Sequence, residues 1–219
     1  MTLTEQINNQ YSKRANRENL YSGGYYVNYV QTELKAKLKI VLDNYYKTTS
    51  ELTLLEIGAG NGTNAFMFEE LGFSIPNISF NELQENRVKN IKANFPKNKL
   101  YEGDAIVLDI TETYDVVFQS TVFSSILANE DRTRLANKMW ALLKPGGIIL
   151  WYDFIYNNPK NKDVKKITQK ELMALFPNRK NILVKKITLA PPIGRKLGRL
   201  TPLFNFPFLR THILVTLQK

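Results

Sequence analysis

The stretch Leu52-Thr-Leu-Leu-Glu-Ile-Gly-Ala-Gly-Asn-Gly-Thr-Asn-Ala-Phe-Met-Phe68 decides the fold of this chain. Its first six residues form an apolar run typical of a buried strand, and the apolar residues at 65, 66 and 68 have helical spacing. Between them lies a glycine-rich turn, where the absence of Cβ atoms lets a ligand approach the backbone closely. The first N–H groups of a helix have no partner within it. The stretch therefore predicts a strand–turn–helix cradle for a small molecule.

The spacing of the glycines narrows the choice of ligand. They occupy positions 58, 60 and 62, whereas a dinucleotide-binding fingerprint needs its third glycine at position 63, which is Thr63 here. Glu56 stands two residues before the first glycine. A carboxylate at that point suits a ligand with an ammonium group better than one with a pyrophosphate. The alternative interpretation is an ordinary strand–glycine–helix turn of an α/β protein.

The length and composition are those of an ordinary globular protein. A length of 219 residues suits one domain with a full core, or one domain with a small cap. No stretch reaches the roughly 18 uncharged apolar residues that a membrane span needs, and the N-terminus lacks a signal pattern. Cysteine is absent, which excludes disulfides, thiolate zinc sites and a cysteine nucleophile. Cytoplasmic location is the default expectation.

The net charge of +10 is unevenly distributed along the chain. Residues 1–154 hold 16 Lys and Arg against 18 Asp and Glu, a net of −2, and residues 155–219 hold 14 against 2, a net of +12. This asymmetry points to an anionic acceptor, which could be a phosphate, a sugar nucleotide, a nucleic acid or a membrane surface. The alternative is a solvated lysine-rich surface.

Further features follow the cradle in a fixed order. The segment Ile75–Phe80 alternates like a second strand, and Glu82 stands 20 residues after Gly62. An acid at the end of the second strand can accept hydrogen bonds from both ribose hydroxyls of an adenosine moiety. Gly103-Asp104-Ala105 ends a short third strand, and Lys144-Pro-Gly-Gly147 separates a helix from a fifth strand at 148–154.

Taken together, these residues resemble the motifs of class I S-adenosyl-L-methionine-dependent methyltransferases. Glu56-Ile-Gly-Ala-Gly-Asn-Gly62 resembles the first motif of that family, and Gly-Asp-Ala resembles its adenine clamp, in which the Asp carboxylate accepts from the exocyclic amine. The Leu-Lys-Pro-Gly-Gly turn is another feature that the family shares. The resemblance implies a Rossmann-like α/β fold: a doubly wound, seven-stranded, mostly parallel sheet with an antiparallel C-terminal strand.

The resemblance also implies a cofactor and its binding residues. The cofactor would be S-adenosyl-L-methionine, the product S-adenosyl-L-homocysteine, and no metal is expected. The predicted cofactor-binding residues are Tyr11, Glu56, Gly58, Ala59, Gly60, Asn61, Asn81, Glu82, Leu83, Gly103, Asp104, Ala105, Gln119 and Ser120.

The domain prediction separates an N-terminal arm, residues 1–30, from a methyltransferase domain at 31–219. Tyr11-Ser-Lys-Arg-Ala-Asn-Arg17 resembles a lid over the cofactor, although tyrosines of the arm could simply pack on the sheet. Apolar residues spaced as in a helix follow at Val30, Leu34, Leu38, Val41 and Leu42. A cap-like insertion is expected at about 190–210, between a sixth strand at 181–189 and a last strand at 211–217. Its Pro, Phe and Arg content suggests a lid, a homodimer contact or a membrane contact.

The acceptor side of the site is expected around the ends of the fourth and fifth strands. The fourth strand ends in Gln119-Ser-Thr-Val122, whereas methyltransferases that act on base exocyclic amines carry Asn/Asp-Pro-Pro-aromatic there, so base N-methylation is disfavoured. The polar loop after the fifth strand should face the ligand crevice. The predicted substrate-binding residues are Phe123, Asn157, Asn158, Arg195, Arg199 and Arg210, with the arginines as anion clamps.

The candidate catalytic residues are Asp153, Tyr156 and His212. His212 is the only histidine, and its pKa range suits a general base, although a structural histidine is the alternative. The stretches Phe154-Ile-Tyr-Asn-Asn-Pro159, Leu189-Ala-Pro-Pro192 and Phe208-Leu-Arg-Thr-His212 resemble a subgroup of these enzymes associated with bacterial surface-glycan biosynthesis. This would imply a sugar or phosphorylated small-molecule acceptor.

Three functions compete at this point. The first is methyl transfer to an O or N atom of a small anionic acceptor: a sugar, a sugar nucleotide or a phosphorylated metabolite. The second is an RNA- or protein-directed methyltransferase, which the basic C-terminal third would favour; nucleic acid is the less favoured partner. The third is a binding module that keeps the fold without catalysis.

Overall fold

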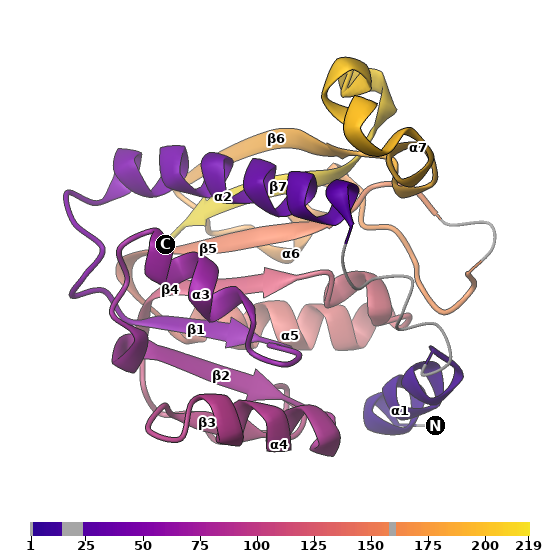
Figure 1. The fold of residues 1–219 in the computed structure, drawn as a ribbon. Helices are drawn as coiled ribbons and strands as arrows, with labels where there is room; N and C mark the ends of the chain where they lie inside the picture. The colour runs from indigo at the N-terminus through magenta and orange to yellow at the C-terminus, as the bar shows by residue number, and fades with distance from the viewer. Residues whose placement is uncertain (1, 15–23, 158–160) are drawn as a thin grey trace.

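The computed structural model describes residues 2–14, 24–157 and 161–219, and its centre is a seven-stranded sheet (Figure 1). The strand order is β3-β2-β1-β4-β5-β7-β6, and β7 alone runs antiparallel to the other six strands. This order confirms the predicted doubly wound fold. The strands are β1 (Leu54–Ile57), β2 (Ile78–Glu82), β3 (Leu100–Glu102), β4 (Tyr114–Ser120), β5 (Leu143–Phe154), β6 (Asn181–Leu189) and β7 (Arg210–Gln218).

Helices cover both faces of the sheet and bury two separate apolar cores. One face carries α2 (Tyr25–Tyr45), α3 (Asn64–Glu70) and α4 (Glu85–Asn94), and the other carries α5 (Asn129–Ala141) and α6 (Gln169–Leu175). Along β5, Leu150 packs toward α2 and Trp151 packs toward α5, as a strand buried on both faces requires. Of the apolar residues predicted to form a helical stripe, Leu34, Leu38, Val41 and Leu42 are buried. Within the described ranges, no helix has the length and apolarity needed to cross a membrane.

The direction of the strands places most of the long connections at one edge of the sheet. Strands β1, β2, β4 and β5 are mutually parallel, so their carboxyl ends lie at the same edge. Strand β6 pairs antiparallel with β7, which itself pairs antiparallel with β5, so β6 ends at this edge too. The connection from β6 to β7, with α7 (Pro191–Leu197), η4 (Gly198–Phe204) and η5 (Pro207–Leu209), therefore starts from the edge where α/β sheets bind their ligands (Figure 1).

Several element boundaries differ from the sequence prediction. The second strand begins at Ile78 rather than at residue 75, because Pro76 lies in the short 3₁₀ turn η2 (Ile75–Asn77) and supplies no N–H for a ladder. The Lys-Pro-Gly-Gly turn lies inside β5, where the pairing with β4 shifts in register between Tyr114 and Val116. The expected domain boundary at residue 30 falls inside α2, and residues 15–17 of the expected lid lie outside the described residues.

Arg132 of α5 connects three segments beneath the sheet. Its side chain is 1% exposed, and its Nε donates to the carbonyl of Ile126 at 2.7 Å. One NH2 group donates to the carbonyl of Lys165 at 2.9 Å, and NH1 forms an ion pair with Glu171 of α6 at 2.6 Å. Glu171 also closes the predicted capping box with Thr168 at the start of α6. The guanidinium therefore joins η3 (Phe123–Ser125), through the residue that follows it, to α6.

Replacing Arg132 should destabilise the fold far more than replacing its exposed neighbour. Arg132→Ala leaves buried carbonyls without a donor, so we expect the free energy of unfolding to fall by about 3 kcal/mol. Arg134→Ala on the same helix removes a half-exposed arginine with a 3.5 Å contact to Asp131 and should cost at most about 0.5 kcal/mol. Urea denaturation of both variants measures the difference. Equal losses would show that the buried network does not hold α6.

Candidate functional site

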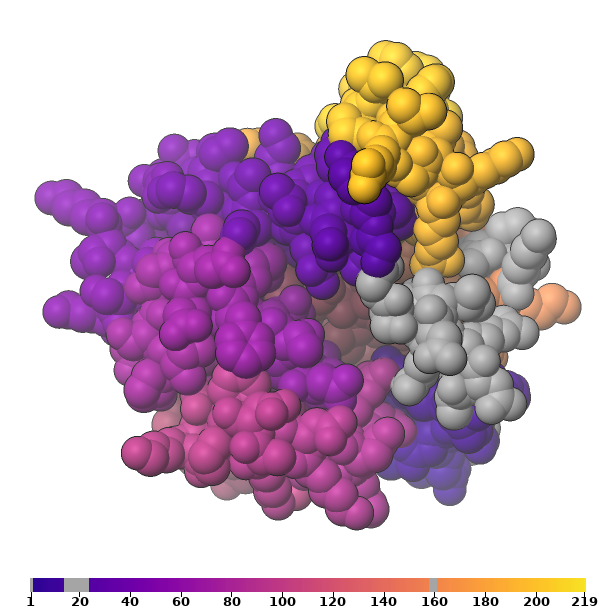
Figure 2. All heavy atoms as spheres, viewed as in Figure 1, coloured from indigo at the N-terminus to yellow at the C-terminus, as the bar shows by residue number. Residues whose placement is uncertain are grey.

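A cavity of about 100 Å³, partly open to solvent, lies at the carboxyl edge of the sheet. It is bounded by α1 (Leu3–Arg14), the glycine turn after β1, the ends of β2 and β3, and the loop after β4. Figure 2 shows the hollow region of this face beside the glycine turn. Many of the predicted cofactor-binding residues line the cavity together: Tyr11, Gly58, Asn81, Glu82, Leu83, Gly103, Asp104, Ala105 and Ser120.

The glycine turn depends on backbone conformations that other residues rarely adopt. Gly58, Gly60 and Gly62 have φ values of +64°, +61° and +75°. A Cβ on Gly58 would lie 2.6 Å from a methyl group of Val122, so this position also needs glycine for close packing. A Cβ on Gly60 would meet no atom within 4 Å. The turn is thus packed against the β4 loop on one side and open on the other.

The carboxylate of Glu82 fixes this turn to the end of β2. One oxygen accepts the N–H of Gly60 at 2.6 Å, and the other accepts those of Leu83 and Gln84 at 2.9 and 2.8 Å. The side chain is 3% exposed and faces the cavity. A carboxylate has room for about four acceptor contacts, so Glu82 retains acceptor capacity for a ligand.

Asn81 and Asp104 shape the neighbouring part of the cavity. The Asn81 amide donates to the carbonyls of Tyr101 and Gly103, both at 3.0 Å, which holds the end of β3 against β2. Asp104 follows directly after Gly103, and its Oδ1 accepts the N–H of Ile106 at 2.9 Å. The other carboxylate oxygen of Asp104 can accept a further hydrogen bond in the cavity wall.

Glu56 lies behind the glycine turn. It is 1% exposed and does not line the cavity, and its Oε1 accepts the amide of Asn64 at 2.6 Å. Its Oε2 has no hydrogen-bond partner among the described residues. Burial raises the pKa of Glu56 to about 8, and the hydrogen bond from Asn64 opposes part of that rise. An unpaired buried carboxylate oxygen is a site that a cationic group can satisfy.

The remaining predicted cofactor residues support the cavity from outside its lining. Gln119 is fully buried, and its Oε1 accepts the N–H of Val122 at 2.9 Å. Ala59 is buried and donates its N–H to the carbonyl of Asn81 at 2.8 Å. Asn61 accepts a hydrogen bond from Asn90 of α4. Their predicted contacts with a cofactor stay predictions.

The N-terminal helix contributes wall residues that the sequence prediction missed. Leu3 and Ile7 line the cavity, together with the predicted Tyr11, whose ring lies 4.2 Å from the guanidinium of Arg87. Gln6 and Gln10 of the same helix donate to the carbonyl of Ser125 at 2.9 and 3.2 Å. The i, i+4, i+8 spacing of residues 3, 7 and 11 was the available signal for this helix.

A threonine from the segment 119–123, which the sequence predicted to line the site, has a strained backbone that was not predicted, and it stands where the cavity meets β5. Thr121 lines the cavity at φ +58°, which is rare for a β-branched residue. Its N–H donates to the carbonyl of Tyr152 at 2.8 Å. The hydroxyl of the same Tyr152 lies 2.8 Å from that of Thr188, which has φ +66° and donates its N–H to Glu33 of α2. Tyr152 thus links two strained positions at this edge.

The structure does not bring the three catalytic candidates together. Asp153 is fully buried, accepts the N–H groups of Ser124 and Phe154, and has a pKa raised to about 6 by burial. His212 pairs with Phe154 in the sheet while Asp153 pairs with Ile213, so Asp153 and His212 project from opposite faces. The His212 ring stacks on Tyr152, and burial lowers its pKa to about 3. Their catalytic roles stay predictions.

The third candidate, Tyr156, is 49% exposed, and its hydroxyl accepts a hydrogen bond from Lys186 at 3.4 Å. It stands two residues beyond the end of β5, in the loop that was expected to face the crevice. In the part of the chain that the structure describes, no group of three or more His, Asp or Glu side chains could hold a metal ion.

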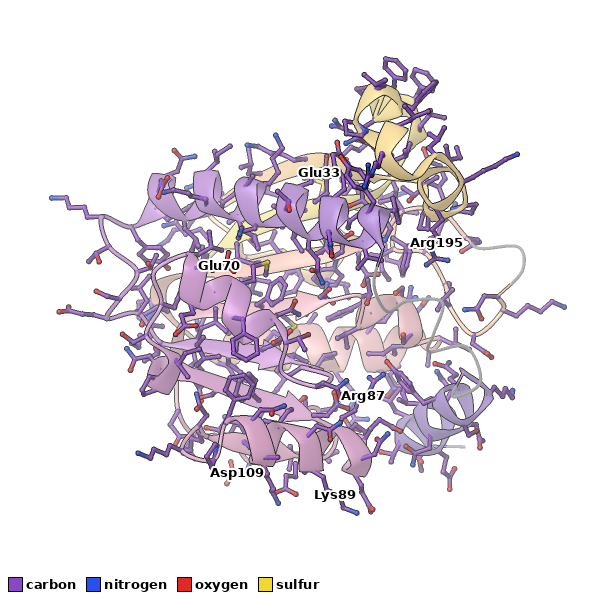
Figure 3. All side chains as sticks on the ribbon, viewed as in Figure 1. Glu33, Glu70, Arg87, Lys89, Asp109 and Arg195 are labelled. Atoms are coloured by element: carbon purple, nitrogen blue, oxygen red, sulfur yellow. The ribbon has the colours of Figure 1, made fainter. Side chains whose placement is uncertain are left out.

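The predicted substrate-binding residues occupy several environments. Phe123 is fully buried against Trp151, with ring centroids 4.0 Å apart, and the Asn157 side chain accepts the N–H of Lys166. Arg210 donates to the side chain and carbonyl of Asn205 at 3.0 and 3.1 Å. Arg195 lies on the underside of α7, toward the strand ends (Figure 3), and Arg199 is exposed. Asn158 lies outside the described residues.

Comparisons with known proteins agree with this geometry. A family model described as a methyltransferase domain matches residues 55–149. No curated protein sequence matches the chain. Among solved structures, CalS10, an amino pentose methyltransferase from Micromonospora echinaspora with bound S-adenosylmethionine, has a TM-score of 0.61 at 14% identity, covering 96% of this chain and 97% of its own.

Two further structures share the fold over most of their length. Streptomyces venezuelae DesVI has a TM-score of 0.56 at 15% identity, covering 94% of this chain and 97% of its own. A putative sarcosine dimethylglycine methyltransferase from Galdieria sulphuraria has a TM-score of 0.63 at 14% identity, covering 86% of each chain. At these identities the likeness shows the fold.

The raised pKa of Glu56 makes a pH-dependent contribution to stability. In the folded state Glu56 keeps its proton up to about pH 8, whereas an unfolded Glu loses it near pH 4.3. The contribution of this proton to the free energy of unfolding is therefore complete below about pH 4.3 and is lost as the pH rises to 8. Glu56→Gln mimics the protonated form and keeps an acceptor for Asn64. We expect the variant to gain stability relative to the parent from pH 5 to pH 8, by at most about 1.4 kcal/mol per pH unit. A stability difference that is flat over this range, measured by urea denaturation, would contradict the assignment.

The methyltransferase-domain match covers the strand–turn–helix cradle and continues into β5. The seven-stranded sheet with its antiparallel β7 is the class I methyltransferase fold. At the carboxyl edge of that sheet, Glu82 and Asp104 line the cavity, and the Glu56 Oε2, which has no partner among the described residues, lies behind the glycine turn. The chain therefore has the class I S-adenosylmethionine-dependent methyltransferase fold, with a methyltransferase-domain match over residues 55–149.

Proposed function

We propose that this enzyme methylates an O or N atom of a small anionic acceptor, which is a sugar, a sugar nucleotide or a phosphorylated metabolite. The observation that carries the proposal is the position of the basic connection 190–210, which contains Arg195 (Figure 3). This connection starts from the edge of the sheet that holds the cavity. The likeness to an amino pentose methyltransferase supports a sugar among these acceptors. We propose a role in the cytoplasm, in surface polysaccharide biosynthesis.

On the donor side, we assign the ribose to Glu82 and the adenine amine to Asp104. Glu82 faces the cavity with acceptor capacity left after its three backbone contacts. Asp104 uses Oδ1 for the N–H of Ile106, which leaves its second oxygen for the amine. We assign Glu56 to the positive charge of the ligand, because its buried Oε2 has no other partner among the described residues.

Bound S-adenosylmethionine supplies an electrophilic methyl group on its sulfonium sulfur. The leaving group is the thioether S-adenosylhomocysteine. The chain's own task is then to align the acceptor atom in line with that methyl group and to exclude water. Residues of α1 and the strained Thr121 border the cavity where this alignment would be set. Of the three proposed catalytic residues, Tyr156 is exposed and can reach an acceptor without rearrangement of the sheet.

The adenine assignment predicts a selective loss of cofactor affinity in Asp104→Asn. Whichever way the new amide turns, its NH₂ group faces either the Ile106 N–H or the adenine amine, and two donors are then left opposed. We expect S-adenosylmethionine binding to weaken by about 1–3 kcal/mol in isothermal titration calorimetry. The matched control is Asp109→Asn, an exposed acid on the same loop outside the cavity lining (Figure 3). Equal effects of the two substitutions would refute the assignment.

The acceptor proposal is tested by a methyl-transfer screen with phosphorylated metabolites, sugar nucleotides, neutral sugars and RNA side by side. We expect activity on an anionic small molecule, and Arg195→Gln should raise its KM roughly tenfold or more without changing the KM of S-adenosylmethionine. Arg134→Gln, which removes one exposed cation from α5, controls for net charge. Activity on RNA alone, with binding that weakens steeply between about 50 and 200 mM salt, would overturn the proposal.

A further inference from the structure

The connection between β6 and β7 buries or hydrogen-bonds some of its polar side chains and exposes most of its large apolar ones. We call residues 190–209 the cap segment. Thr201 is fully buried and its hydroxyl donates to the carbonyl of Gly198, while the amide of Asn205 donates to Tyr29 and Glu33 of α2 at 2.9 and 2.8 Å. The exposed large apolar side chains of the segment are Ile193, Leu200, Leu203, Phe204, Phe206 and Phe208.

The base of the cap segment is held firmly, so this exposure is built into the fold. A Cβ on Gly194 would lie 2.0 Å from the ring of Tyr26, which shows how closely α7 approaches α2. The hydroxyl of Tyr26 donates to the carbonyl of Leu189 at 2.6 Å, at the point where the segment begins. Arg210 holds the other end through Asn205. The side chains of Thr201, Asn205 and Arg210 attach the segment, and its large apolar side chains remain exposed.

The exposed apolar side chains gather on a projection. Figure 2 shows the segment standing out from the body of the molecule, next to the start of α2. Leu203 and Phe208 are 68% and 74% exposed, and the rings of Phe206 and Phe208 stack with centroids 5.7 Å apart. Contiguous exposed apolar surface of this kind marks an interaction site.

The charge of the projection has a single sign. Lys196 and Arg199 are exposed within the cap segment, and no Asp or Glu follows Glu171 in the chain. Apolar and aromatic side chains flanked by cations are the combination with which peripheral proteins enter the interfacial region of an anionic bilayer.

We propose that the cap segment docks on an anionic lipid surface, with its Leu and Phe side chains in the interfacial region and Lys196 and Arg199 against the lipid phosphates. The proposal does not depend on which acceptor is methylated. It places the carboxyl edge of the sheet, and with it the mouth of the cavity, near the membrane, because the segment starts from that edge.

A second copy of the chain fits this surface less well. A twofold contact through the cap segment would bring Lys196 and Arg199 of one copy close to those of the other. No carboxylate of the segment would offset that repulsion. A stable dimer also buries about 800 Å² on each partner, which a narrow projection does not provide by itself.

The test is co-sedimentation of the purified full chain with vesicles of phosphatidylglycerol mixed with phosphatidylcholine, and with vesicles of phosphatidylcholine alone. We expect binding to the anionic vesicles that weakens at high salt. The double variant Leu203→Asp/Phe208→Asp should lower the partition coefficient at least tenfold. Its matched control is Val107→Asp, which is 69% exposed and follows β3, the strand at the other end of the sheet order from β6.

Two further variants separate the charge from the apolar contribution. Removing two cations in Lys196→Gln/Arg199→Gln should lower binding to anionic vesicles about fivefold for each charge and leave binding to neutral vesicles unchanged. Phe208→Trp places an indole at the most exposed of these positions, and its fluorescence should shift to the blue with anionic vesicles only.

Two results would overturn the proposal. One is a partition coefficient that is the same for the parent and for Leu203→Asp/Phe208→Asp. The other is a concentration-dependent dimer, seen by light scattering, that this variant abolishes while the parent binds no vesicles; the occupant would then be a second copy. Because all the substituted side chains are exposed, a thermal unfolding scan that matches the parent will show that each variant is folded.

Discussion

The shape of the crevice depends on the hydrogen bonds that the Glu82 carboxylate accepts from the backbone. Its two oxygens accept N–H groups from the glycine turn and from the residues after β2, so two separate segments are fixed by one side chain. The turn needs this, since glycines at positive φ lose more conformational freedom on folding than any other residue. Asn81 extends the same arrangement to the end of β3. The glycine turn and the ends of β2 and β3 are therefore one hydrogen-bonded unit.

Charge divides the carboxyl edge of the sheet into two parts. Carboxylates of Glu56, Glu82 and Asp104 gather around the glycine turn, whereas the connection after β6 contributes only cations. The sequence shows the same division, with 18 acids in residues 1–154 and 2 in the remainder. Such a field favours a cationic ligand at one end of the crevice and an anionic one at the other.

Local patterns in the sequence predicted much of the fold and of the donor side. Strand β6 has the predicted bounds, and the glycine spacing identified the turn, because both signals lie within a few residues. The helix α1 was missed because its burial depends on Ser125, more than a hundred residues away. Asp153 and His212 were grouped although they project from opposite faces, since the register between β5 and β7 is a tertiary property. The positive φ of Thr121 has no signal in its residue type.

The hydrogen bonds of Tyr152 couple two strained positions at the carboxyl edge of the sheet. Its carbonyl binds Thr121 beside the donor cavity, and its hydroxyl binds Thr188 at the end of β6. Both threonines hold backbone conformations that cost of order 1–3 kcal/mol each. Tyr152 therefore connects the backbone at Thr121 to that at Thr188 across the β5–β7–β6 ladder. A residue without the hydroxyl would leave Thr188 without this bond, so the two strained positions would no longer be coupled through one side chain.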